Sequence, residues 1–389
     1  MEHVFGGGIV SLNGEEWKIL RRFFLQAFKD CGTTSSEAYH ECLNATFEDL
    51  ATSQGNPVDM TNIMLDRCSK IMRDTVFGHE GVTEDEIRDL NEAYGKILET
   101  LSSTKLFLFG KVAKKLFFPF LGGYNQSKIY RQKMLDVLHK NIAQHESRYD
   151  ENNIRDLIDM YIKERKTRIQ KRDPIAKHFT NDVLACTLLQ LVGDGILSVA
   201  AYVNIFLQGL VEYPEEQEKV HDEIIDVIGP DRQTTIDDKN KLPYTNAFMY
   251  EVIRKSDFTP MLPSVECTTE TTIRGYRIPK GAVTLPNYWA ANHDPETYDD
   301  PDTFNPSRFL ATPNKPRAEL PVLFGVGKRA CIGETFTTTQ AFLFLTSIAQ
   351  KFKLSKPSEP AGNDSVSLTP GHTYILVNSR KEGCEIDLS

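Results

Sequence analysis

Apolar residues recur at helical spacing through the first two thirds of the chain. The segments WKILRRFFLQAF (17–28), RQKMLDVLHKNIAQ (131–144) and IRDLIDMYIKE (154–164) place them three or four positions apart, a pattern typical of amphipathic helices. The first of these helices is expected to begin near Glu15. The pattern predicts that residues 15–267 are mainly helical.

Residues 181–212 form a long apolar stretch, NDVLACTLLQLVGDGILSVAAYVNIFLQGLVE, that is long enough to cross a membrane. Asp194 lies in its middle, between Gly193 and Gly195, and argues against a membrane span. A helix buried on all sides in a large helical domain fits better. Two glycines weaken a helix by about 1 kcal/mol each relative to alanine, and such a place can let a ligand approach closely.

The pattern changes after residue 267. The segment TTIRGYRIPKGAVTLPN (271–287) alternates and contains turn residues, which predicts short strands. Residues 293–323 are rich in proline and acid but hold Phe304 and Phe309, as in an ordered, packed loop. We expect a mainly α fold with a minor β part, in a single domain over 1–389 whose β-rich part is 268–389.

Composition narrows the class of protein. The chain has 389 residues and a net charge of −9, which argues against a nucleic-acid-binding protein. Its seven cysteines include no C-x-x-C pair, so structural zinc and a disulfide framework are not expected, and a reducing compartment fits best. The N-terminal residues show neither a signal peptide nor an apolar run of membrane-spanning length.

Cys331 has unusual neighbours, in FGVGKRACIGETF. A thiolate that binds a metal needs shielded, donor-rich surroundings, because hydrogen bonds to the sulfur set its basicity and redox potential. Gly325 and Gly327 would let the backbone turn tightly. A helix starting just after the sulfur favours the anionic form, and Gly333 leaves room for a flat cofactor. Cys331 is therefore a candidate metal ligand.

Three further groups of residues are weaker when taken singly. Glu251 and Arg254 share one helix face and could be an ordinary surface pair, although their apolar neighbours indicate burial. Arg308 lies in FNPSRF, where its planar guanidinium could complete a Glu-Arg-Arg cluster. Trp17 and Arg21 are four positions apart and could hold an anionic group of a cofactor, or simply belong to an amphipathic helix.

Taken together, these elements resemble the cytochrome P-450 haem-thiolate monooxygenases, in particular their microsomal animal members. The resemblance covers nearly the whole chain. The family's E-x-x-R, F-x-P-x-R-F and W-x-x-x-R elements are met at 251–254, 304–309 and 17–21. Its signature F-x-x-G-x-R-x-C-x-G is met at Phe324, Gly327, Arg329, Cys331 and Gly333.

The resemblance implies haem b as cofactor, with Cys331 as the fifth ligand of the iron. Trp17, Arg21 and Arg329 would hold the propionates, and Glu251, Arg254 and Arg308 would form a buried structural cluster. The residues expected to contact the haem are Trp17, Arg21, Phe324, Gly327, Arg329 and Gly333.

The resemblance also implies an activity and partners. Family members take electrons from NADPH through a flavoprotein reductase, and they insert one oxygen atom of dioxygen into a lipophilic small molecule such as a xenobiotic, fatty acid or steroid. Lys18, Arg22 and Lys328 could meet the reductase or simply be solvated. Relatives lie on the cytosolic face of the endoplasmic reticulum membrane, whereas a chain without an anchor could be cytoplasmic. Substrate-pocket candidates, by position, are Leu191, Ile196, Phe258, Leu262 and His372.

The chain departs from the family in three places. The membrane anchor, hinge, first helix and first strands are absent, so we expect a truncated product. In DGILS the family's acid and threonine are replaced by Leu197 and Ser198, which leaves Ser198 and Asp194 as candidate catalytic residues for proton delivery. Ser264 stands where a base often contacts a propionate. A haem-thiolate isomerase or lyase that acts on oxidised lipid, or an inactive remnant, are the alternatives.

Overall fold

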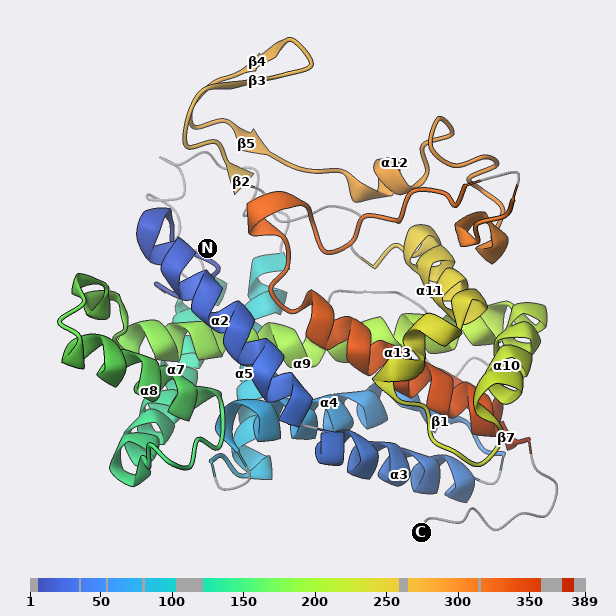
Figure 1. The fold of residues 1–389 in the computed structure, drawn as a ribbon, viewed down its shortest axis with the longest axis horizontal. Coiled ribbons are helices and arrows are strands. Elements are labelled where there is room, and N and C mark those ends of the chain that lie inside the picture. The colour runs from blue at the N-terminus through green and yellow to red at the C-terminus, as the bar shows by residue number, and fades with distance from the viewer. Residues whose placement is uncertain are drawn as a thin grey trace. The chain divides into compact units, whose positions relative to one another are not determined.

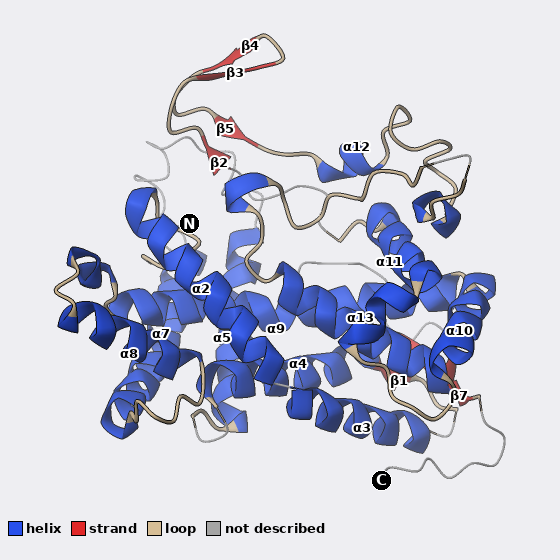
Figure 2. Ribbon diagram, viewed as in Figure 1, coloured by secondary structure: helices blue, strands red, loops and turns tan. Residues whose placement is uncertain are grey.

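The computed structural model describes residues 6–34, 36–53, 55–78, 81–102, 122–258, 265–313, 316–357 and 373–380. Helices dominate the described residues, and the strands are short (Figures 1 and 2). The chain forms two compact units, described separately below: the first comprises Met1–Asn204, Ile332–Phe344 and Pro357–Ser389, and the second comprises Ile205–Cys331 and Leu345–Lys356. The mainly helical fold is confirmed, and the single domain stays a prediction.

The first unit is a group of packed helices with two short strands. β1 (Val58–Asp59) pairs antiparallel with β7 (Tyr374–Ser379), with Val58 opposite Ile375. α9 (Asn181–Glu212) and α13 (Glu334–Lys351) each begin in this unit and continue into the second. The other helices of this unit are α2 (Gly14–Thr34), α3 (Ser36–Thr52), α4 (Met60–Phe77), α5 (Glu84–Ser102), α7 (Gly122–Arg148), α8 (Leu157–Gln170) and the 3-10 helix η3 (Pro174–His178).

α9 is the described helix that is long and apolar enough to cross a membrane. Of its most apolar window, 78% is buried inside the protein. The core helix predicted from the sequence is therefore found at the predicted residues. Asp194 and its two flanking glycines lie in its middle.

The second unit carries short helices and two small antiparallel sheets. Pro214 opens α10 (Pro214–Ile228), which ends before Gly229. β2 (Val265–Glu266) pairs with β5 (Val283–Thr284), and β3 (Thr271–Ile273) pairs with β4 (Tyr276–Ile278). The remaining elements are α10 (Pro214–Ile228), η4 (Ile236–Lys241), α11 (Pro243–Lys255), α12 (Tyr288–Asn292), η5 (Pro306–Phe309), η6 (Gly327–Arg329) and β6 (Phe352–Ser355).

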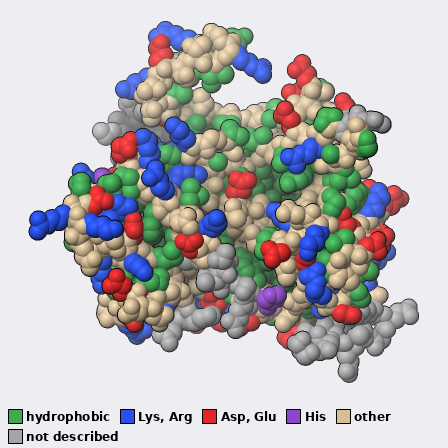
Figure 3. Space-filling model, viewed as in Figure 1, with side chains coloured by type: hydrophobic (Ala, Val, Ile, Leu, Met, Phe, Trp, Pro, Cys, Tyr) green, Lys and Arg blue, Asp and Glu red, His purple; other side chains and the backbone are tan. Residues whose placement is uncertain are grey.

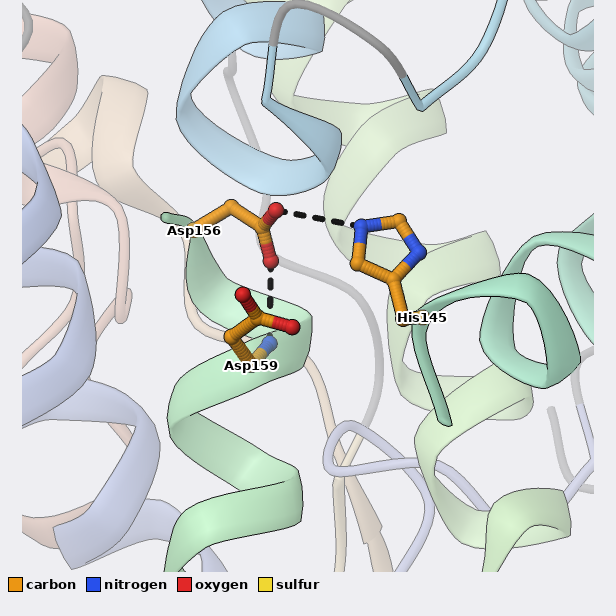
Figure 4. A group of neighbouring side chains, drawn as sticks. All are labelled: His145, Asp156 and Asp159. Carbon is orange, nitrogen blue, oxygen red and sulfur yellow. Dashed lines mark hydrogen bonds and ion pairs between the residues drawn. The ribbon is translucent and has the colours of Figure 1, made fainter. Parts of the chain in front are cut away.

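A buried charged group joins α4, α7 and α8 within the first unit. The imidazole of His145 points at the carboxylate of Asp156, which also accepts the backbone N–H of Asp159 (Figure 4). His145 Nδ1 lies 2.8 Å from the carbonyl oxygen of Asn141. Its Nε2 lies 3.0 Å from Asp156 Oδ2 and 3.3 Å from the carbonyl oxygen of Phe77. Both ring nitrogens face acceptors, so this arrangement favours the imidazolium, in which both nitrogens are donors.

The same three side chains could in principle hold a metal ion, since their ligand atoms lie within 4.8 Å of one another. Each ligand atom already has a partner. Arg155 donates to Asp159 through Nε at 2.7 Å and through a terminal nitrogen at 3.0 Å, and Asp156 and His145 use their remaining atoms as described above. The group is therefore a complete ion-pair network that stabilises the helix ends.

This network predicts a pH dependence of stability. Burial alone would lower the pKa of His145, but the hydrogen bond and charge of Asp156 outweigh it and raise the pKa above 6.5. The ion pair therefore contributes fully below pH 6.5 and is lost as the pH rises through the folded-state pKa. We expect the free energy of unfolding, measured by urea titration at several pH values, to fall over that window, and we expect H145Q to abolish the fall.

H139Q is the matched control, because His139 lies on the same helix but its side chain is 39% exposed. This variant should keep the pH dependence of the unmodified chain. An unchanged pH dependence in H145Q would show that other groups are responsible.

Candidate active site

The loop from Phe324 to Cys331 is a tight structure that presents a thiol. The backbone N–H of Cys331 donates to the carbonyl oxygen of Phe324 at 2.6 Å and closes the loop. Gly325 and Gly327 have φ of +80° and +74°, a left-handed region that favours glycine. A Cβ at Gly327 would meet no atom within 4 Å, so the backbone conformation rather than crowding favours glycine there.

Cys331 ends this loop with an exposed side chain. Phe324 is half-buried, and Arg329 is exposed. The chain then passes through Gly333 and enters α13 at Glu334. A half-buried aromatic ring, a thiol and a guanidinium therefore lie within eight residues of one another along the loop, and the thiol is exposed, whereas the sequence predicts shielded surroundings.

Trp17 and Arg21 lie on one face of α2, in the first unit. Trp17 is buried, and the guanidinium carbon of Arg21 is 5.6 Å from the centre of its ring. Further along α2, Phe28 packs edge-on against Phe336 of α13, with ring centres 5.8 Å apart. This contact fixes α2 against the segment that follows Gly333.

The structure brings Glu251, Arg254 and Arg308 together in the second unit. Both oxygens of Glu251 accept from Arg254 at 2.8 Å, and Arg308 Nε donates to Glu251 Oε1 at 3.2 Å. The side chains of Glu251 and Arg254 are 0% exposed, and that of Arg308 is 7% exposed. The surface-pair alternative for Glu251 and Arg254 is therefore wrong.

The two guanidinium groups exceed the single carboxylate in charge, and backbone carbonyls accept their remaining N–H groups. Arg254 donates to the carbonyl oxygens of Asn292, Pro301 and Thr303 at 2.8–3.3 Å. Arg308 donates to those of Asp299, Asp300 and Thr303 at 2.7–3.2 Å. The cluster thus fastens the irregular segment 292–308 to α11.

On α9, Asp194 and Ser198 are exposed, and Leu197, expected at the position of the family's acid, is buried. The hydroxyl of Tyr94 on α5 donates to Asp194 Oδ1 at 2.5 Å. Although part of Asp194 is accessible, desolvation by the protein around its carboxyl raises the pKa to about 6, and the bond from Tyr94 lowers it. Sequence reasoning missed Tyr94, because nothing in the sequence around a tyrosine 100 positions away marks it as a partner.

The glycines beside Asp194 make room for protein side chains. A Cβ at Gly193 would lie 2.2 Å from the ring of Tyr94, and one at Gly195 would lie 2.2 Å from the terminal methyl of Met72. Gly193 is needed for packing against the rigid ring of Tyr94, whereas the terminal methyl of Met72 ends a flexible side chain that can move away from Gly195. The close approach expected here is made by α5 and α4.

The comparisons with known proteins agree with these motifs. The family model for cytochrome P450 matches residues 2–377. The chain belongs to the cytochrome P450 family. Cytochrome P450 2B2 of Rattus norvegicus is 33% identical over 378 residues, covering 95% of this chain and 74% of that protein. Cytochrome P450 2B4 of Oryctolagus cuniculus is 32% identical over 380 residues, covering 95% and 75%.

Solved structures support the same assignment of this cytochrome P450. A zebra fish cytochrome P450 with progesterone superposes with a TM-score of 0.81 at 25% identity, covering 97% of this chain and 86% of that one. A second zebra fish structure, with abiraterone, has a TM-score of 0.78 at 25% identity and covers 97% and 85%. The P450 fold is shown, and the family makes this chain an oxidoreductase of the monooxygenase type.

The residues of this P450 suit a haem chemically. The accessible thiol of Cys331 is a soft ligand of the kind that binds haem iron in P450s. Trp17, Arg21 and Arg329 are N–H donors suited to carboxylates. The candidates for the substrate pocket differ in exposure: Leu191 is buried, Ile196 has no accessible surface, and Phe258 is half-buried. Leu262, Ser264 and His372 lie outside the described residues.

Proposed function

We propose that this P450 is a haem-thiolate monooxygenase that acts on a lipophilic small molecule, a xenobiotic, fatty acid or steroid, with Cys331 as the axial ligand of haem b. The observation that carries the proposal is the closed loop that ends in an accessible Cys331 thiol directly before α13. Bound haem would supply oxygen activation, which a thiolate ligand favours by donating electron density.

The chain's own residues would bind and orient. Trp17, Arg21 and Arg329 would hold the propionates by charge-assisted hydrogen bonds, and Phe324 would shield the sulfur from water. Gly327 and Gly333 would let the loop lie close to the cofactor. On α9, the hydroxyl of Ser198 can donate a proton or a hydrogen bond, and the carboxyl of Asp194, whose pKa desolvation raises to about 6, can exchange a proton at a higher pH than an ordinary aspartate.

The electrons would come from NADPH through a flavoprotein reductase. Lys18, Arg22 and Lys328 are exposed and are candidates for its docking surface. On the face seen in Figure 3, basic side chains are interspersed with acidic ones, unlike the continuous basic surface of nucleic-acid-binding proteins. By its resemblance to microsomal P450s, we place the enzyme on the cytosolic face of the endoplasmic reticulum membrane.

A second candidate function rests on Leu197. Its side chain is buried and aliphatic, and if it stands where the family has an acid, as the resemblance implies, this site would have one proton carrier fewer. A haem-thiolate isomerase or lyase that rearranges an oxidised lipid needs no proton delivery to dioxygen, and Leu197 would not impair it.

Turnover with two kinds of co-substrate separates the candidates. The purified, haem-loaded chain would be given lipophilic substrates with dioxygen, NADPH and a microsomal flavoprotein reductase, and in parallel a fatty-acid hydroperoxide. A monooxygenase forms an oxygenated product in the first assay. Rearrangement of the hydroperoxide, with no product from dioxygen, would favour the isomerase or lyase.

A further inference from the structure

One side of α9, at Asp194 and Ser198, is accessible to solvent, although the helix around it is buried. Between Leu184 and Ala200, every residue is buried except Asp194, Gly195 and Ser198. Asp194 and Ser198 are four positions apart and share one face of the helix. The carboxyl of Asp194 accepts a hydrogen bond from the buried Tyr94, so one side of it lies against packed protein while the residue remains accessible.

Tyr94 holds the Asp194 carboxyl in one orientation. The tyrosine is 1% exposed, and its ring packs on Gly193, where any larger residue would collide with it. Burial and the neighbouring Asp194 raise the pKa of Tyr94 well above its ordinary value, so the phenol stays a donor to Asp194 Oδ1. The hydrogen bond from this packed tyrosine therefore restricts the Asp194 carboxyl to one orientation.

The second oxygen of Asp194 is still available. Within the part of the chain that the structure describes, the carboxyl has Tyr94 as its hydrogen-bond partner and forms no ion pair with a cation. A partly desolvated carboxylate without a cation is costly, and a charged donor that pairs with it offsets that cost. The ligand chemistry that this site suits best is a protonated amine.

We infer that Asp194, oriented by Tyr94, is an anchor for lipophilic amines, whose N–H⁺ group donates to the free carboxylate oxygen while their apolar part occupies the rest of the site. The inference rests on the proposed function, because it assumes that the accessible side of α9, with Asp194 and Ser198, faces the substrate. Tyr94 acts through Asp194 and is a positioning residue.

The test uses two probes of the same shape: dimethyl(phenylbutyl)amine, and its neutral isostere in which CH replaces N–H⁺. Binding to the haem-loaded chain is measured by calorimetry and by the shift of the Soret band. D194N should weaken binding of the amine about ten- to hundredfold, as expected for loss of a charge-assisted hydrogen bond, and leave the isostere unchanged. D182N is the matched control, since Asp182 lies on the same helix and its side chain is 90% exposed.

A pH titration tests the same inference without relying on D194N. In the unmodified chain, affinity for the amine should fall as the pH drops through about 6, where the Asp194 carboxylate gains a proton, and affinity for the isostere should not. Y94F removes a bond that stabilises the anion, so it should move this midpoint to higher pH. A purely structural role for Tyr94 would leave the midpoint in place.

The outcomes separate this inference from the proposed function. Each variant is first checked for a reduced carbon-monoxide band at the thiolate position. If that band is present but the unmodified chain and D194N bind the amine equally well, the amine anchor is wrong and the monooxygenase proposal stands. If D194N binds the amine normally but lowers product formed per NADPH with every substrate, Asp194 serves proton delivery instead. If the band is absent from the unmodified chain, the proposed function itself fails.

Discussion

Replacing Arg254 with methionine is expected to lower the free energy of unfolding by about 3–5 kcal/mol. The change leaves the fully buried Glu251 carboxylate without its bidentate partner. It also removes the donors to the carbonyl oxygens of Asn292, Pro301 and Thr303. Removing one partner of a buried ion pair lowers the free energy of unfolding by more than the pair contributes to it, since the remaining charge stays desolvated. Urea unfolding of the purified chain measures the effect.

Lys255 offers a matched control. It is the next residue of α11, it is only half-buried, and it also donates to a backbone carbonyl, that of Asp302 at 2.9 Å. K255M should change the free energy of unfolding by no more than about 1 kcal/mol. The double variant E251Q/R254M should cost less than the two single losses added together. Equal costs for R254M and K255M would mean that the cluster does not hold the segment 292–308.

Replacing Cys331 with alanine is expected to abolish product formation from dioxygen and NADPH. Alanine offers no ligand atom, and whatever replaces the sulfur would not donate the electron density that a thiolate does. The loop should survive, because its closing bond uses the backbone N–H of residue 331 and the side chain is exposed. Circular dichroism and the haem-to-protein ratio would be measured beside product formation.

C267A is the corresponding control. Cys267 is half-buried, and its backbone forms hydrogen bonds with Gly281 and Ala282, which alanine can also make. This variant should keep both haem and activity. If C331A retained product formation, Cys331 would not be the axial ligand.

Much of the Cys331 loop and of the pair Glu251–Arg254 was predictable, because the residues that form each of them are close together in the sequence. The glycines, Arg329 and Cys331 lie within one short loop, and Glu251 and Arg254 lie three apart on one helix. For such groups, spacing alone specifies shared faces and turns. The mainly helical character predicted for residues 15–267 followed from apolar periodicity in the same way.

The surroundings of Asp194 on α9 were less predictable, since the contacts there join residues that are far apart in the sequence. Gly193 and Gly195 were expected to admit a ligand, yet the packing partners are Tyr94 and Met72. A small residue in a helix indicates close approach without indicating what approaches. Likewise, His145 and Asp156 were not singled out, because their pairing depends on how the end of α7 meets the start of α8.

The reduced carbon-monoxide difference spectrum of the purified, haem-loaded chain tests the central claim most directly, because it reports haem binding and thiolate ligation together. With Cys331 as axial ligand, the unmodified chain should give a Soret band at the position characteristic of thiolate-ligated haem, and C331A should not. A band at the position of histidine-ligated or free haem in the unmodified chain, or a thiolate band that persists in C331A, would contradict the account.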